Sequence, residues 1–383
     1  MAIDPKLRIS LITEADCLSV YPPMEAVEIV QDVQNLDEVR QAALKLGSHR
    51  DFAAIVAPGE SSIPTGGYLR SYFGMAGMSF DVAHAFCNKH AMKNRLRAAG
   101  VPVADDRLAE TSQVLRERVL ENGFPAVVKP VWSDGAAHVH VVRDNGELDA
   151  LTRSDSPFLR EQSAPFLVEE FVQFDEEFHC DGLVYDGEVV FVASSQYIRP
   201  TLNAFGRTYG SFTLPSSSPH TYALRELHRR AVAALGLQNS VTHMEAFRTK
   251  DGFMVGEIAC RPGGGVVPRQ MLDAYGFDTW RHFMATELNE QIEWSPRVSP
   301  GVWLTVQFPL RRGTVRSVPD CNIFEDVPAV IDTEVRVRPG QCIDGTLYAS
   351  SMSGMSHCHL SSIEEVEPLI ELLETRFTVE YER

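Results

Sequence analysis

Residues 243 to 259 have the pattern of a β-hairpin in which each strand carries a glutamate. Polar and apolar residues alternate in the segments 243–247 and 255–259, and the turn signal Lys-Asp-Gly lies between them at 250–252. If those three residues form the loop, with the glycine in the left-handed conformation, Glu245 lies directly opposite Glu257. The hairpin therefore predicts two acidic side chains facing each other on one side of a sheet.

Two facing carboxylates destabilise a sheet unless a cation lies between them. Oxygen ligands of this kind suit Mg²⁺, so we expect a magnesium site at Glu245 and Glu257. Because side chains alternate along a strand, His243 and Arg261 belong on the same face. A loop of two or four residues is an alternative, because it would shift the register and turn both glutamates to solvent.

A lysine ends another apolar segment. Ala126 to Pro130 has the pattern of a strand, with Lys129 near its end and a loop of small residues just beyond. A buried lysine needs an anionic partner, and phosphate is a natural one. In the alternative, the lysine simply extends from the strand end into solvent.

Acidic residues close a third apolar strand. Leu167 to Val172 contains Glu169 and Glu170, and Glu176 and Glu177 follow shortly after. Carboxylates in such positions can accept hydrogen bonds from the amino group of adenine and from ribose hydroxyls. The alternative is a solvated acidic strand end.

Composition excludes several classes of protein. The chain has 383 residues, and 35 basic against 52 acidic residues give a net charge of −17, which argues against a general nucleic-acid binder. No apolar run reaches the length of a membrane span, so we expect no membrane partner. The seven scattered cysteines show no C-x-x-C spacing, which favours reduced thiols and a cytoplasmic protein.

Strands and helices alternate in the N-terminal part, which is typical of a parallel α/β sheet. We expect strands at Leu7 to Ile12 and Phe52 to Ala57, a helix at Leu36 to Leu46, and one continuous helix from His84 to Ala99. Residues 196–218 show no period and are expected to form a long loop over a site.

Taken together, these features resemble the ATP-grasp ligases over about residues 86 to 290. The resemblance rests on five motifs in the family's order: Asn88-Lys89 with Gly100-Val101-Pro102, Val128-Lys129-Pro130, Leu167 to Val172, His243-Met244-Glu245, and Glu257 to Gly264. The pattern Glu257-x-Ala259-x-Arg261 is most similar to the bacterial L-amino acid (dipeptide) ligases.

The resemblance implies ATP as a cofactor and a set of residues that bind it. These are Lys89 and Lys129 for the phosphates, Glu169 with the backbone around Val172 for adenine, and Glu176 or Glu177, with Glu177 favoured, for ribose. The loop Ser133 to Ala137 would close over the phosphates, and residues 196–218 would cover the site.

The resemblance also implies the residues of the reaction centre. Glu245 and Glu257 would hold Mg²⁺, for which Mn²⁺ can substitute, and Arg261 would act on the transferring phosphoryl group. His243, Gly263 and Gly264 would contact the substrate. Two positions depart from the family pattern. Asn88 replaces the usual aspartate, and Ala259 replaces an asparagine that is a further metal ligand in many members.

The implied fold is a mixed α/β ATP-grasp fold with an N-terminal Rossmann-like domain at 1–85. The ATP-grasp domain would span 86–295, with a lid subdomain at about 110–195, and a C-terminal α+β part would span 296–383. The implied activity is that of a carboxylate–amine ligase (EC 6.3 type) that acts through an acyl phosphate on two small-molecule substrates, with a homodimer as the expected assembly. The alternatives are a carboxylase, a purine-pathway type of ligase, or a silent nucleotide-binding protein.

Overall fold

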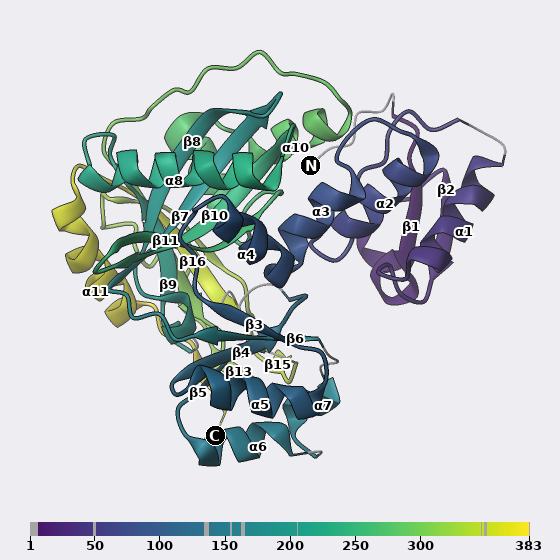
Figure 1. Ribbon diagram of the computed structural model, residues 1–383. Coiled ribbons are helices and arrows are strands. Elements are labelled where there is room, and N and C mark those ends of the chain that lie inside the picture. The colour runs from purple at the N-terminus through teal and green to yellow at the C-terminus, as the bar shows by residue number, and fades with distance from the viewer. Residues whose placement is uncertain are drawn as a thin grey trace.

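The structure is a computed structural model that describes residues 7–48, 51–133, 138–153, 155–161, 165–204, 206–345, 347 and 351–382. In this part of the chain, helices surround one large sheet and several smaller ones (Figure 1). The N-terminal strands lie to one side of the large sheet, and a four-stranded sheet lies below it in this view. The mixed helix-and-strand architecture expected from the sequence is confirmed.

The N-terminal unit contains a two-stranded parallel sheet, β1 (Ser10–Glu14) and β2 (Ala26–Val30), joined by η1 (Ala15–Val20). Helices α1 (Leu36–Gly47) and α2 (Ile63–Phe73) pack against it. The expected strand at 52–57 is wrong, because this segment has no strand partner and the second strand is β2. Side chains satisfy its backbone instead: the Ile55 carbonyl accepts from Arg70 Nε at 3.1 Å, and the Ala57 amide donates to Glu287 at 3.2 Å.

The continuous helix expected from His84 to Ala99 is also wrong. Two helices occupy this stretch, α3 (Phe80–Cys87) and α4 (Lys89–Ala98), and they meet at Asn88. Asn88 has an extended backbone, and its side chain accepts a hydrogen bond from the Ala91 amide at 2.9 Å, so it caps the second helix. The break places Lys89 at the first position of α4 rather than in the middle of a longer helix.

A four-stranded sheet in the order β3-β6-β4-β5 follows. Its strands are β3 (Asp106–Ala109), β4 (Ala126–Pro130), β5 (His140–Val142) and β6 (Phe166–Glu170), and its helices are α5 (Ser112–Asn122), α6 (Asn145–Thr152) and α7 (Pro157–Glu161). Strands β4 and β5 pair antiparallel, with Ala126 opposite Val142. A separate apolar core, which includes Leu115, Val128 and Phe166, holds this unit together.

The large sheet has eight strands in the order β11-β10-β7-β8-β9-β12-β16-β14. They are β7 (Glu176–Tyr185), β8 (Glu188–Tyr197), β9 (Tyr209–Thr213), β10 (Ser240–Thr249), β11 (Gly252–Ala259), β12 (Val302–Pro309), β14 (Val330–Val335) and β16 (Met352–Leu360). Part of the expected loop at 196–218 is therefore strand β9, and the described remainder includes η2 (Thr201–Asn203).

The remaining described elements include helices that contact the large sheet and the strands of a separate three-stranded sheet. They are α8 (Pro219–Leu235), α9 (Val267–Tyr275), α10 (Thr279–Glu287), β13 (Gly313–Ser317), β15 (Cys342–Ile343), η3 (Ile363–Glu365), α11 (Val366–Arg376) and β17 (Glu380–Tyr381). Among the described residues, the helices are all too short or too polar to cross a lipid bilayer.

The two faces of the large sheet differ in polarity. One face carries apolar residues that pack with α8 into the main core, among them Phe178, Cys180, Met244, Ala246 and Ile258. Their neighbours in sequence point the opposite way and include Glu177, His179, Asp181, His243 and Glu245. We call this second side the polar face, and the candidate site lies on it.

Candidate active site

The hairpin β10–β11 places Glu245 directly opposite Glu257, as the sequence predicted. The predicted three-residue loop is wrong, because Thr249 pairs with Gly252 and the turn has two residues. A β-bulge compensates for the difference: Gly256 has no partner in the register, so the strands regain the expected pairing at Glu257. The shorter turn shifts the register by one residue, and the bulge shifts it back. The two acidic residues therefore share the polar face.

Lys89, at the start of α4, contacts Glu257 of this pair. Its Nζ lies 3.0 Å from Glu257 Oε1, and it also donates to the Ser133 carbonyl. Burial alone would lower the pKa of Lys89, but the neighbouring Glu257 carboxylate outweighs burial and raises it. In turn, burial alone would raise the pKa of Glu257, but Lys89 and then Lys129 lower it. Both groups are therefore charged at neutral pH.

Lys129 shares one carboxylate with a second lysine. Glu169 Oε1 lies 3.0 Å from Lys129 Nζ and 3.2 Å from Lys93 Nζ, and all three residues are largely buried. Because Lys93 also neutralises Glu169, Lys129 can turn toward a phosphate without leaving that carboxylate unpaired. Sequence reasoning missed Lys93, although its position four residues after Lys89 puts it on the same side of α4.

The two candidate ribose ligands lie on opposite sides of β7. Glu177 is buried on the polar face and accepts hydrogen bonds from the Thr201 amide at 2.7 Å and the Thr201 hydroxyl at 3.0 Å. Glu176 lies near the strand edge with Arg248, whose guanidinium is 2.5 Å from the carboxylate. Only Glu177 therefore shares a face with Glu245. Burial, followed by the Glu245 charge, raises the pKa of Glu177 to about 8.

We expect Glu177→Gln to stabilise the ligand-free protein more at pH 8 than at pH 5. The folded protein keeps the Glu177 proton up to a pKa of about 8, whereas the unfolded chain loses it near pH ~4.3. Unfolding thus releases a proton between these pH values, so wild-type stability falls as the pH rises through them. Glutamine has no proton to release.

Urea denaturation at a series of pH values checks this prediction. The difference in free energy of unfolding between Glu177→Gln and wild type should grow toward pH 8, reaching a few kcal/mol at most. Glu188→Gln, at an exposed position on the neighbouring strand β8, should show no such growth. A difference that stays constant with pH would contradict the prediction.

Arg261 lies two residues beyond the end of β11, and its Nε is 2.6 Å from a carboxylate oxygen of Glu60. Its NH1 group donates to the Pro262 carbonyl at 2.9 Å. Glu60 comes from the N-terminal unit, 201 residues earlier in the chain, and sequence reasoning missed it. The sequence around Glu60 does not indicate this contact, because a single acidic residue in a turn is common.

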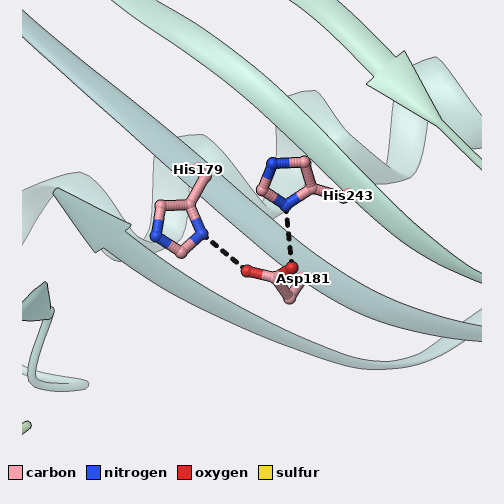
Figure 2. Close-up of side chains that lie close together, drawn as sticks. All are labelled: His179, Asp181 and His243. Carbon is pink, nitrogen blue, oxygen red and sulfur yellow. Dashed lines mark hydrogen bonds and ion pairs between the residues drawn. The ribbon is translucent and has the colours of Figure 1, made fainter. Parts of the chain in front are cut away.

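His243 belongs to a buried cluster with Asp181 and His179, all on the polar face (Figure 2). The two carboxylate oxygens of Asp181 lie 2.6 Å from His179 Nδ1 and 2.9 Å from His243 Nδ1. Burial alone would raise the pKa of Asp181, but His243 and His179 hold it well below its usual range. A side chain at Gly263 would collide with the paired His243 and Asp181, because its Cβ would lie 2.7 Å from His243 Nδ1.

The hydrogen bonds made by His179 and its neighbours argue against a metal ion in this cluster. Gln270 donates through Nε2 to the Ser211 and Trp303 carbonyls, so its Oε1 must accept the Ser211 hydroxyl proton. The Ser211 oxygen then has to accept from His179 Nε2, 2.8 Å away. Both ring nitrogens of His179 are therefore engaged, one with Ser211 and one with Asp181, so a metal ion would have to displace one of these hydrogen bonds.

Glu245 and Glu257, in contrast, fit Mg²⁺. Both are carboxylates on directly paired residues, so the ligand atoms that they offer are all oxygen. Ala259 contributes no ligand, as the sequence indicated. The backbone next to this site is open at Gly264, where an added Cβ would meet no described heavy atom within 4 Å.

Two predicted covering segments are described only in part. Of the loop 133–137, only Ser133 belongs to the described residues, and the rest lies outside them. In the segment 196–218, Thr201 contacts Glu177, and the ring of Tyr209 stacks on Tyr197 at a centroid distance of 5.3 Å. Val172, the predicted adenine contact, lies half-buried in the connection between β6 and β7.

Residues 122–269 match a known protein family described as the ATP-grasp domain. The matched stretch contains the candidate site residues Lys129, Glu169, Glu245, Glu257 and Arg261, whereas Lys89 lies before it.

Among the known proteins that are similar to this chain are two enzymes and one protein of known crystal structure. The L-arginine-specific L-amino acid ligase of Bacillus subtilis is 30% identical, with 97% of this chain and 91% of the relative covered. Dapdiamide A synthase of Enterobacter agglomerans is 27% identical over 49% of this chain and 45% of its own length. An L-amino acid ligase from Bacillus licheniformis has the same fold, with a TM-score of 0.75 at 20% identity over 98% of this chain and 93% of that protein.

Proposed function

This chain belongs to the ATP-grasp family of L-amino acid ligases, and from that membership we propose that it uses ATP to join the carboxylate of an amino acid to an amine. It is an ATP-dependent ligase that forms an amide or peptide bond. The observation that carries the residue assignments is the pairing of Glu245 with Glu257 beside Lys89 and close to Arg261.

ATP would bind between the four-stranded sheet and the polar face. Lys129 and Lys89 would contact its phosphates, Glu169 and the Val172 backbone would hold adenine, and Glu177 would hold ribose. The lysines are already paired with Glu169 and Glu257, so phosphate binding exchanges one anionic partner for another. Such an exchange avoids a buried, unpaired ammonium group at any stage.

Glu245 and Glu257 would hold Mg²⁺ or Mn²⁺, which supplies further positive charge to the phosphates when bound. Glu257 would have two partners in turn. It pairs with Lys89 in the described structure, and it would hold the cation when ATP is bound. If Lys89 turned to a phosphate, Glu257 would be free to hold the cation. The two changes would be complementary, because each charged side chain would keep a partner of opposite charge.

The reaction then requires that the substrates are positioned and that the charge developing during phosphoryl transfer is stabilised. An oxygen of the substrate carboxylate attacks the γ-phosphorus of ATP, the bond to ADP breaks, and an acyl phosphate forms. The amine nitrogen next attacks the acyl carbon and gives up a proton, and phosphate leaves. Arg261 would stabilise the charge on the transferring group, because its planar guanidinium can bind two oxygens at once.

The amino-acid substrates would lie beside Arg261, where His243, Gly263 and Gly264 meet. Gly263 leaves room for the His243–Asp181 pair, and Gly264 keeps the backbone open. L-arginine is the first substrate to test, since the relative from Bacillus subtilis is specific for it.

The test is phosphate release from ATP and Mg²⁺ with pairs of amino acids, followed by mass spectrometry of the products. We expect release that requires two partners and a product whose mass equals their sum minus water. ATP turnover that depends on bicarbonate, or that needs no amine, would contradict the proposal. The domain limits at 85 and 295, the cytoplasmic location and the homodimer stay predictions.

A further inference from the structure

Glu60 lies at the edge of the N-terminal unit and is bound there by specific hydrogen bonds. It lies in a turn just before α2, where the Ser62 amide donates to the Gly59 carbonyl at 2.9 Å and the Gly59 amide donates to the Ser62 hydroxyl at 3.1 Å. Its side chain is only 12% exposed, although carboxylates are rarely buried without a specific partner. That partner is Arg261, at 2.6 Å.

The segment that carries Arg261 is equally constrained. The preceding Cys260 carbonyl accepts a hydrogen bond from the Ser240 hydroxyl at 2.9 Å, and Pro262 follows directly. Arg261 is 20% exposed, and its Nε and NH1 groups are engaged by Glu60 and by the Pro262 carbonyl. A contact from its own loop and a contact from a distant unit therefore both act on the guanidinium.

We propose that Glu60 is a positioning residue for Arg261, so that the N-terminal unit completes the reaction centre. The inference rests on the proposed role of Arg261 and adds that the orientation of its guanidinium is imposed by Glu60. A charge-assisted hydrogen bond of this length selects one orientation of a long, flexible side chain. The neighbouring charges agree with this role: the buried Glu60 carboxylate lies near Glu257 and Lys89 as well as Arg261.

A purely structural role for Glu60 can be separated from positioning. The N-terminal unit has a second buried ion pair with the rest of the chain, Arg70 of α2 with Glu287 of α10, whose side chains are 2% and 5% exposed. Glu287 also accepts from the Ala57 amide, so this pair helps to dock the unit. If Glu60 only helped docking, weakening either pair would have the same consequence for turnover.

The experiment compares Glu60→Ala, Glu60→Gln and Glu287→Gln with wild type. ADP formation with saturating amino acids gives kcat, titration of ATP gives KM and, by calorimetry, Kd, and hydroxylamine trapping gives the yield of acyl phosphate. Thermal unfolding reports stability in the absence of ligands. Glu60→Gln keeps an oxygen that accepts from Arg261 Nε, so it serves as the conservative variant.

We expect Glu60→Ala to lower kcat and the hydroxamate yield at least tenfold while KM and Kd for ATP change less than twofold. Glu60→Gln should recover part of kcat, and Glu287→Gln should lower the unfolding temperature without a comparable loss of kcat. Unchanged kcat in Glu60→Ala, or an equal loss in Glu287→Gln, would overturn the inference. If wild type itself formed no ADP that depends on amino acids, the proposed function would fail first, independently of Glu60.

Discussion

Glu257→Gln is expected to remove measurable turnover while the protein stays folded. Glutamine nearly preserves the shape of the side chain but loses the charge that would bind Mg²⁺ and that now pairs with Lys89 at 3.0 Å. Loss of charge stabilisation where charge develops during phosphoryl transfer lowers kcat by about a thousandfold or more. Glu257 is partly exposed at 28%, and Lys89 keeps its bond to the Ser133 carbonyl, so stability should change by only ~1–2 kcal/mol.

Steady-state ADP formation and thermal unfolding check this prediction together. Glu188→Gln, an exposed carboxylate on β8, is the matched control and should retain wild-type kcat. Turnover by Glu257→Gln at the wild-type rate would remove Glu257 from the metal site. Loss of folding in that variant would mean that the Lys89–Glu257 pair is chiefly structural.

Lys89→Met is expected to weaken ATP binding about 10- to 100-fold. Lys89 is buried, begins α4, and would exchange Glu257 for a phosphate when ATP binds. A charge-assisted hydrogen bond to an anion contributes ~1.5–3 kcal/mol, which corresponds to that range of affinity. Methionine preserves the packing of the aliphatic part of the side chain, and Glu257 can regain water, so the variant should fold.

Calorimetric titration with a non-hydrolysable ATP analogue in the presence of Mg²⁺ measures this effect. Arg95→Met is the matched control, because Arg95 is on the same helix but pairs with Asp81 at the surface. Arg95→Met should bind the analogue as wild type does. Equal affinity in Lys89→Met and wild type would show that this lysine does not contact the phosphates.

The ATP-grasp fold and the ligase activity could be predicted because each depends on short motifs, whereas the side chains assigned to the nucleotide stay predictions. Alternation along β10 and β11 was enough to put Glu245, Glu257 and His243 on one face. The correct pairing nevertheless came from a loop that is one residue shorter than predicted, corrected by the bulge at Gly256. A bulge leaves little trace in composition, since one glycine in a strand has several possible causes.

The errors occurred where long-range contacts override local pattern. The segment 52–57 is apolar enough for a strand, but its backbone groups bond to Arg70 and Glu287 instead of to a neighbouring strand. The stretch 84–99 has a helical period throughout, yet the chain turns at Asn88 and starts a new helix there. In both cases the local propensity was compatible with two structures, and tertiary contacts selected one.

By itself, the sequence determined the residue types, the alternation that sorts them onto faces, and the order of the motifs. These depend on neighbours within a few positions, where backbone geometry alone decides direction. Only the tertiary structure decided which distant groups meet: Glu60 with Arg261 across 201 positions, Lys93 with Glu169, and Asp181 with His243. Such partnerships depend on how separate units pack, because a charge interacts with whatever lies within a few ångströms, whatever its place in the chain.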